Sequence, residues 1–325
     1  MKALAAAISC FSLAACGYWS IDQPTVENPV TPPQGWQAAS QGNGGKISSG
    51  WIKQFGDPRL AELIADAIAN NHDLAAASAR MREAHYNAVG ERARLLPTLD
   101  ASARGGVTDS LTAPTAEDYR LSLNVSWELD LWGRLRKLSR AGANNAFAAT
   151  EDYRDARLSL AANTGRAYFN LISANQQVEL AKEILESFQS NLRIIERNYK
   201  GTGEGALDIQ FGRNNVASAQ RTLEARELNR EEAARTLELL LGRYPAGTLQ
   251  ADAELPKLSV TVPAGLPLQL LERRPDLRAA KARLLASANR ADAARLNLLP
   301  DLSITASGGN SSSNFERLLD LDRLV

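Results

Sequence analysis

The chain has 325 residues with Lys plus Arg and Asp plus Glu equal at 37 each, which gives a formal net charge of +0 at pH 7. This balance provides neither the basic surface that nucleic acid binds nor an acidic tail. Aromatic residues make up only 6% of the chain, and alanine, leucine and arginine are abundant, which is typical of helix bundles rather than of all-β sandwiches. We therefore expect a mainly helical protein with no nucleic-acid partner.

Residues 1–15 have the features of a bacterial export signal. Lys2 is a minimal charged region, and the apolar stretch that follows it is too short to span a membrane. The sequence Leu13-Ala14-Ala15-Cys16 resembles a lipobox, which implies cleavage before Cys16 and attachment of acyl chains such as palmitate to its thiol. The alternative is an ordinary signal peptide that leaves a free thiol at Cys16.

The segment 16–50 is rich in proline, glycine and serine and predicts a tether followed by a loop. No uninterrupted run of about 18 apolar residues follows the N-terminus, so we expect no membrane-spanning helix. Any membrane crossing would then have to use strands.

An internal duplication organises the rest of the chain. The segment that begins at Asp73 matches, without a gap, the segment that begins at Asp276. Each copy is an Ala/Arg-rich helix that ends at Leu-Leu-Pro, because proline cannot continue a helix interior. Alternating apolar and polar residues follow each proline, so each copy predicts a helix and then a strand.

The stretch Asp118–Gly133 reads DYRLSLNVSWELDLWG and alternates in the same way. It predicts the second strand of the first repeat, joined to the first strand by a hairpin loop at Asp109–Glu117. A soluble strand averages about 5 to 6 residues, whereas a tilted strand that crosses a bilayer needs roughly 9 to 11. On its own the stretch fits a membrane strand and an exposed strand of a soluble sandwich equally well.

Beyond Gly133 the apolar period changes from two residues to alternating steps of three and four, the seam of a left-handed coiled coil. We predict one long helix from about Ser139 to Tyr199, roughly 90 Å at 1.5 Å per residue, and a second from about Ala206 to Leu241. The segment Lys200–Gly205 is the predicted turn. The predicted seam consists of Thr164, Ala167, Leu171, Ala174, Val178, Ala181, Leu185, Phe188, Leu192, Ile195 and Tyr199.

Two repeats of two strands give at most four strands, whereas the smallest bacterial membrane barrels have about 8. Several copies of the chain would therefore have to share one barrel, since open sheet edges are not tolerated in lipid.

At this point the sequence resembles the outer membrane factor family, the TolC-like channels of tripartite efflux and type I secretion systems. The specific motifs are WELDLWGRLR at Trp127–Arg136, LERRPDLRAA at Leu271–Ala280 and GALD at Gly205–Asp208. The resemblance implies a homotrimer with a twelve-stranded outer-membrane barrel and a periplasmic helical tunnel. It also implies docking to a periplasmic adaptor and an inner-membrane transporter, and a passive conduit with neither cofactor nor enzymatic activity.

The resemblance also assigns roles to particular residues and segments. The periplasmic tip, with the aperture and the adaptor contact, is expected at Tyr199, Gly201, Gly205, Leu207 and Asp208, and the strand-to-helix turn at Trp132, Gly133 and Arg134. The expected segments are a signal peptide (1–15), a lipid-anchored linker (16–50), first-repeat equatorial helices (51–96), a barrel strand pair (97–132), the long helical hairpin (133–245), a linker with the start of the second repeat (246–275), and the helix and first strand of a truncated second repeat (276–325).

The sequence departs from the family pattern after the second Gly-Gly pair. A complete member continues there into another strand and a second long hairpin, whereas this chain ends at Val325. The rival hypothesis is accordingly a non-conducting lipoprotein whose helical hairpin acts as a periplasmic scaffold. The sequence does not name the exported compound, the adaptor or the pump.

The motif GTGEGA at Gly201 resembles a phosphate-binding loop, but no strand precedes it, which favours a helix-hairpin turn. Asp208, just past this turn, is interpreted as an electrostatic cap of the second helix or as part of an acidic constriction, and the two roles are compatible.

Candidate catalytic or metal-binding residues have simpler explanations. Glu128 and Asp130 share one strand face, as paired catalytic carboxylates do, but wet-side residues near the end of a barrel strand are favoured. His72 and His85 fit no zinc spacing and are expected to be solvated helix residues. No Ser/His/Asp or Cys/His arrangement is present in the sequence, so no metal or catalytic site is predicted.

Overall fold

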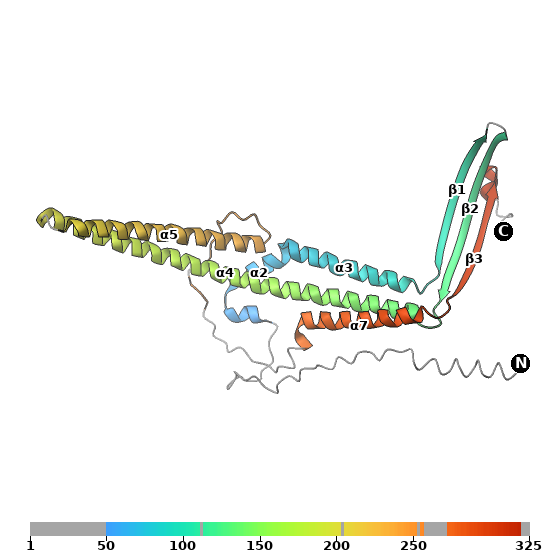
Figure 1. Cartoon of the computed structure of the whole chain (residues 1–325), viewed down its shortest axis with the longest axis horizontal. Coiled ribbons are helices and arrows are strands. Elements are labelled where there is room, and N and C mark those ends of the chain that lie inside the picture. The colour runs from blue at the N-terminus through green and yellow to red at the C-terminus, as the bar shows by residue number, and fades with distance from the viewer. Residues whose placement is uncertain (1–49, 111–112, 203–204, 252–253, 257–271, 320–325) are drawn as a thin grey trace. The chain divides into compact units, whose positions relative to one another are not determined.

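The computed structural model describes residues 50–110, 113–202, 205–251, 254–256 and 272–319 (Figure 1). The predicted signal and lipid site, Cys16 included, lie outside the described residues. The elements in chain order are η1 (Trp51–Phe55), α2 (Pro58–Asn70), α3 (His72–Ala93), β1 (Thr98–Ser110), β2 (Ala113–Leu129), α4 (Arg134–Thr202), α5 (Ala206–Leu240), α7 (Pro275–Leu296), β3 (Leu302–Ser312) and η2 (Phe315–Leu319).

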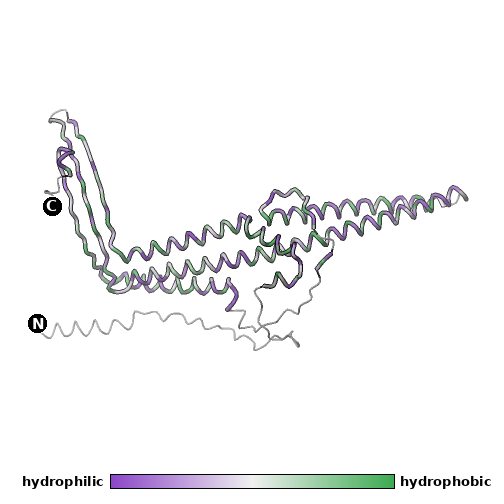
Figure 2. Tube along the Cα trace, turned by 180° about the vertical axis from the view of Figure 1, so that it is seen from behind, coloured by the Kyte–Doolittle hydropathy of each residue, from purple (hydrophilic) through white to green (hydrophobic). Residues whose placement is uncertain are grey.

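The described residues form a mainly helical chain with a small strand part, as predicted, and they divide into two compact units. The first unit holds residues from 80–151 and 276–319, with all three strands. The second holds residues from 50–79 and 152–275, with α5 and the part of α4 that follows residue 151. No helix in the described part of the chain is both long enough and apolar enough for a membrane span. Polar residues recur along every long helix in Figure 2.

The first unit contains an antiparallel sheet in the order β1-β2-β3. Strand β2 is central. Its ladder with β1 runs from Thr98↔Ser126 to Ser110↔Ala113, and its ladder with β3 runs from Leu129↔Leu302 to Tyr119↔Ser312. Because side chains alternate between the two faces of a strand, this register places most polar residues on one face and most apolar residues on the other. Glu117, Asn310 and Ser312 are polar exceptions on the apolar face.

The predicted hairpin loop at Asp109–Glu117 is wrong. Val107 pairs with Glu117, and the ladder continues to Ser110↔Ala113 with an irregularity just before it. Pro114 lies within β2 although it lacks a backbone N–H donor. However, the pairing of β2 with β3 ends at Tyr119↔Ser312, so this proline removes no bond between those two strands.

The second unit has a core between α2, α4 and α5, in which Leu60, Tyr168 and Leu237 are 0% exposed. Helix α2 begins cleanly because Asp57 Oδ1 accepts a hydrogen bond from the N–H of Leu60 at 3.0 Å and Pro58 occupies the first turn.

The join between α2 and α3 is tied to the end of α5. Asn71 Oδ1 accepts the N–H of Leu74 at 2.9 Å, while its amide donates to the carbonyl of Leu240 at 3.1 Å. Gly242, at φ +69°, passes so close to this join that an added Cβ would lie 2.3 Å from the carbonyl oxygen of Asn70. Glycine is therefore required here on both conformational and steric grounds.

A buried carboxylate organises the segment after α5. Glu238 is 4% exposed and accepts hydrogen bonds from the backbone N–H groups of Gly247 at 2.7 Å and of Thr248 and Leu249 at 3.0 Å each. Burial alone would raise the pKa of Glu238, but the backbone donors outweigh it and the pKa lies below its usual value. The anion thus holds the chain reversal that follows α5.

The predicted coiled-coil seam is confirmed along its first half. Thr164, Leu171 and Leu185 are buried on α4, and the cluster around Leu185 includes Leu223 of α5. Towards the hairpin turn the burial decreases, so that Phe188 is 37% exposed. Helix α4 begins at Arg134, earlier than predicted, and ends at Thr202, later than predicted.

Candidate functional sites at the strand-to-helix junction and the hairpin tip

Asp130 lies between strand β2 and helix α4, and its side chain caps the start of the helix. Its Oδ1 accepts the N–H of Leu135 at 2.9 Å, and its Oδ2 accepts both the N–H of Arg136 at 2.9 Å and the Arg136 Nε–H at 3.0 Å. Two of the free N–H groups at the helix start are satisfied in this way, which explains why α4 begins before Ser139.

The charge state of Asp130 follows from the same contacts. Partial burial would raise the pKa of this carboxyl, but the backbone N–H groups of Arg136 and Leu135 and the Arg136 guanidinium outweigh it and lower the pKa below its usual value. Asp130 is therefore an anion at neutral pH, where it complements the positive end of the α4 dipole.

Trp132, Gly133 and Arg134 lie between the end of β2 and the first turn of α4. Gly133 adopts φ +84°, a left-handed conformation that permits the sharp turn. Arg134 forms a hydrogen-bonded ion pair with Glu128 of β2 and lies 3.8 Å from Asp301, just before β3. The Trp132 indole N–H donates to the carbonyl of Pro300 at 3.0 Å.

The paired carboxylates therefore have structural partners. Glu128 faces Arg134 and Asp130 caps α4, which agrees with the non-catalytic interpretation of both residues. His72 and His85 are exposed on α3, as expected, and His85 lies 3.4 Å from the Thr150 hydroxyl. Within the described ranges, no three His, Cys, Asp or Glu side chains are grouped in a way that could hold a metal ion.

Two ion pairs that the sequence did not reveal join α4 to α7. Lys137 Nζ lies 2.6 Å from Asp292 Oδ2, and the Arg278 guanidinium lies 3.1 Å from the buried carboxylate of Glu151. Arg278 also lies over the Phe147 ring, 5.5 Å from its centre. The partners are far apart in the chain, so no local pattern could have paired them.

The hairpin tip is formed by the end of α4 and the start of α5. Gly205 precedes α5 at φ +96°, and its carbonyl accepts the N–H of Asp208 at 3.0 Å. Asp208 lies in the first turn of α5, the position expected for an electrostatic cap. Gly201 belongs to the last turn of α4 rather than to the predicted turn at Lys200–Gly205.

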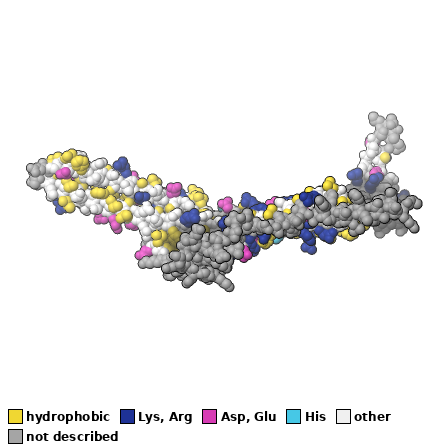
Figure 3. Space-filling view, turned by 60° about the horizontal axis from the view of Figure 1, so that its bottom comes forward, with side chains coloured by type: hydrophobic (Ala, Val, Ile, Leu, Met, Phe, Trp, Pro, Cys, Tyr) yellow, Lys and Arg dark blue, Asp and Glu magenta, His cyan; other side chains and the backbone are white. Residues whose placement is uncertain are grey.

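The tip exposes large apolar side chains. Leu207 is 66% and Phe211 59% exposed, whereas Ile209 between them is buried, and Tyr199 on α4 is 37% exposed. Phe211 was not among the predicted tip residues, although its spacing of four from Leu207 puts both on one helix face. Apolar side chains are also visible along the hairpin in Figure 3.

A small antiparallel sheet joined by a tight, ion-paired turn to a very long helical hairpin places the chain in the structural class of the outer-membrane efflux channels. The family model described as "Outer membrane efflux protein" matches residues 63–243 and 266–322. The chain belongs to this family.

Relatives and solved structures agree with this assignment. The pyoverdine export outer membrane protein OpmQ of Pseudomonas putida is 33% identical over 95% of this chain and 68% of its own length. The toluene efflux pump outer membrane protein TtgF of Pseudomonas putida is 34% identical over 83% of this chain and 58% of TtgF. The Campylobacter jejuni CmeC outer membrane channel has a TM-score of 0.78 at 26% identity and covers 93% of this chain and 68% of CmeC. The chain thus spans 58 to 68% of the length of these relatives.

Proposed function

We propose that this chain is the outer-membrane channel subunit of a tripartite efflux or type I secretion system. It provides a passive conduit by which an inner-membrane pump sends small molecules out of the cell. The observation that carries the proposal is the joint at Trp132–Arg134, which connects a two-faced sheet to a helical hairpin within a chain of the outer membrane efflux protein family.

The sheet supports assembly with further strands. Strands β1 and β3 each pair on one side only among the described residues. Unpaired backbone groups are costly in lipid, so a membrane-crossing sheet must continue into neighbouring strands. We propose that these neighbours come from a homotrimer held in the outer-membrane lipid, with Cys16 as its lipid anchor.

The hairpin tip supports contact with a periplasmic adaptor. In this proposal Tyr199, Gly201, Gly205, Leu207 and Asp208 form the aperture and the docking surface. Exposed Leu207 offers the apolar anchor that protein interfaces usually contain. A displacement of the tips opens the conduit, because the packing of coiled-coil helices is suited to two alternative arrangements.

Similarity to the relatives does not identify the compound that this chain exports. Relatives of comparable identity are named for pyoverdine export, toluene efflux and cation efflux. A wide conduit imposes few chemical requirements on what passes through it, so the proposal is limited to small molecules.

An export assay tests the proposal. The chain is expressed together with an adaptor and a pump in a bacterium that lacks its own outer-membrane efflux channel, and the cellular accumulation of a fluorescent efflux substrate is measured. We expect accumulation to fall relative to the empty vector, and the chain to run as a trimer in mild detergent. A monomeric outer-membrane lipoprotein that leaves accumulation unchanged would refute the channel and favour the periplasmic scaffold. Incorporation of labelled palmitate, lost in Cys16→Ser, tests the anchor separately.

A further inference from the structure

Two arginines lie directly opposite each other in the middle of the sheet. The register pairs Arg104 of β1 with Arg120 of β2, and both side chains are exposed. Residues directly opposite in an antiparallel pair have Cβ atoms roughly 5 Å apart, so the two guanidinium groups share one patch of the polar face.

Neither arginine is neutralised by a described carboxylate. No ion pair joins Arg104 or Arg120 to any acidic side chain in the described ranges. Asp118 is two residues from Arg120 on the same face, but it pairs across the strands with Gly106 and forms no ion pair with either arginine. Like charges directly opposite each other destabilise a sheet, and an anion bound between the two arginines would reduce this repulsion.

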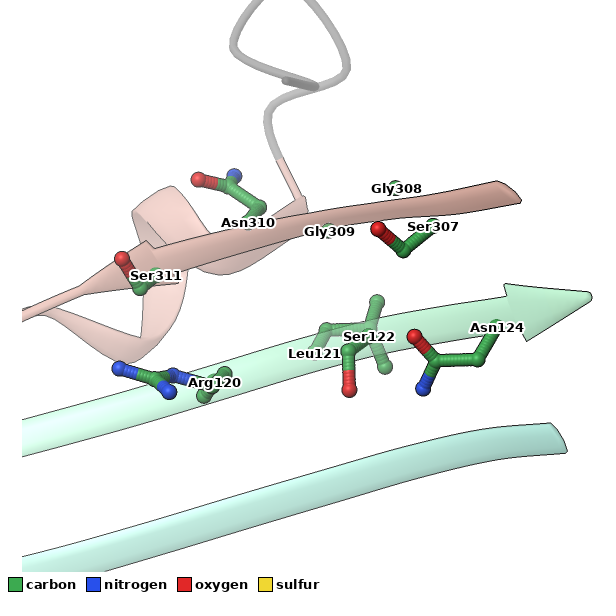
Figure 4. Close-up of a pocket in the computed structure, with 9 residues that line it drawn as sticks. All are labelled: Arg120, Leu121, Ser122, Asn124, Ser307, Gly308, Gly309, Asn310 and Ser311. Atoms are coloured by element: carbon green, nitrogen blue, oxygen red, sulfur yellow. The ribbon is translucent and has the colours of Figure 1, made fainter. Parts of the chain in front are cut away.

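The space next to Arg120 is open and carries hydrogen-bonding groups. A hollow of about 480 Å³ is lined by Arg120, Leu121, Ser122 and Asn124 of β2 and by residues 307–311 of β3 (Figure 4), and Arg104 of β1 lies beside this lining rather than in it. Gly309 faces Ser122 across the strands, and a Cβ added there would lie 2.6 Å from the Leu121 carbonyl oxygen. Glycine therefore allows β3 to pair closely with β2 and adds no side chain to the hollow.

We propose that Arg104 and Arg120 form a binding site for small oxyanions, of the phosphate or carboxylate class, with Ser122 and Asn124 as neighbouring hydrogen-bond donors. Two planar guanidinium groups carried by directly opposite residues of one sheet face suit the oxygens of such an anion, which can receive several charge-assisted hydrogen bonds. Lipid phosphate is a poorer occupant, because Leu123 and Val125 lie on the opposite, apolar face of the sheet by register.

The inference rests on the proposed function for its physiological meaning. If the polar face lines the conduit, every subunit contributes one arginine pair at the same height, and the pairs form a cationic ring. Rings of arginine or lysine select for anions in membrane pores. The site would then favour the passage of anionic solutes over cationic ones.

Binding is tested on the purified chain in a phosphate-free maltoside detergent by ³¹P NMR line broadening of inorganic phosphate. We expect Arg104→Gln and Arg120→Gln each to weaken the apparent affinity about tenfold, since each removes a charge-assisted hydrogen-bonding group. The matched control is Arg226→Gln, because Arg226 is an exposed arginine on α5 that is in no ion pair with a described residue. The double variant with lysine at both positions keeps the charge but loses the planar fork, and should bind with intermediate affinity.

The outcomes separate clearly. Absence of broadening with the unaltered chain, equal affinity in the double glutamine variant, or equal loss in Arg226→Gln would each overturn the site. The glutamine variants are not expected to unfold, since they remove a like-charge contact, and circular dichroism verifies this.

Export provides the second arm, with an anionic dye such as carboxyfluorescein and a cationic dye such as ethidium. We expect the double glutamine variant to lose export of the anionic dye only. If it exports both dyes as well as the unaltered chain does, the ring does not select anions. If the unaltered chain exports neither dye while phosphate binding depends on the arginines, the proposed function fails and the anion site stands.

Discussion

Replacing Glu238 by Gln tests whether one buried anion holds the chain reversal after α5. The two carboxylate oxygens accept three backbone N–H groups, one at 2.7 Å and two at 3.0 Å. A glutamine can keep the two longer bonds with its carbonyl oxygen, but its NH₂ group then faces the N–H of Gly247, donor against donor. Hydrogen bonds to a charged group contribute about 1.5 to 3 kcal/mol each, and an unmet buried donor costs a further amount of about 1 to 3 kcal/mol. We expect the free energy of unfolding to fall by about 2–4 kcal/mol.

Urea unfolding followed by circular dichroism at pH 7 measures this loss. With a slope of about 3 kcal/mol per molar urea, the midpoint should fall by roughly 1 M. Glu232→Gln is the matched control, because Glu232 is exposed on the same helix and in no ion pair with a described residue, and its midpoint should stay unchanged.

The pH dependence provides a second measurement with a defined sign. The pKa of Glu238 is lowered in the folded chain from its usual value of 4.5. Its contribution is therefore fully present above pH 4.5 and is lost as the pH falls through the lower folded value. The difference between unaltered chain and Glu238→Gln should be constant from pH 7 to pH 5 and shrink in more acidic solution. A midpoint of Glu238→Gln equal to that of the control at pH 7, or a difference that grows on acidification, would refute the reasoning.

Three further predictions follow from single contacts. Gly242→Ala should lower the free energy of unfolding by about 1–3 kcal/mol, measured by urea unfolding, because its φ of +69° and the carbonyl of Asn70 both exclude a Cβ, and a stability equal to the unaltered chain would contradict this. Asp130→Asn should lower the free energy of unfolding by about 1–2 kcal/mol and speed amide hydrogen exchange in residues 134–138 only. Exchange in these residues as slow as in the unaltered chain would show that Asp130 does not cap α4. Leu207→Ser should change the free energy of unfolding by no more than about 0.5 kcal/mol but reduce dye export. The matched control is Leu228→Ser, at a leucine that is 64% exposed on the same helix, and it should not reduce export. Equal export by the two variants would show that the tip does not take part in adaptor docking.

The sequence predicted those features that a local period encodes. Alternation located the strands, and steps of three and four located the seam from Thr164 to Leu185, since both patterns reflect which side of one element is buried. The start of α4 was missed because the cap comes from Asp130, which lies just after β2 and ahead of the helical period. The loop at Asp109–Glu117 was predicted too long, because the ladder between β1 and β2 continues through Val107↔Glu117 and Thr108↔Ala116 to Ser110↔Ala113.

Side-chain partners across long sequence distances could not be predicted at all. Lys137 and Asp292 are ordinary helix-surface residues in the sequence, and nothing near Glu238 indicates that it faces the backbone after Gly242. The pair of Arg104 and Arg120 could be predicted in part. Both arginines are on the polar face by period, but their opposition depends on the register of β1 against β2, which is known only from the structure.

The internal duplication gives a reason for the two tryptophans of the WELDLWG motif. Each repeat ends its helix at Leu-Leu-Pro and then enters an outer strand of the sheet, β1 in the first repeat and β3 in the second. Strand β2 lies between them, so its end is flanked by both repeat joints. The Trp127 indole donates to the carbonyl of Leu95 at 3.1 Å, on the β1 side, and that of Trp132 donates to Pro300, on the β3 side. The WELDLWG segment therefore donates one indole hydrogen bond to a backbone carbonyl at the Leu-Leu-Pro segment of each repeat.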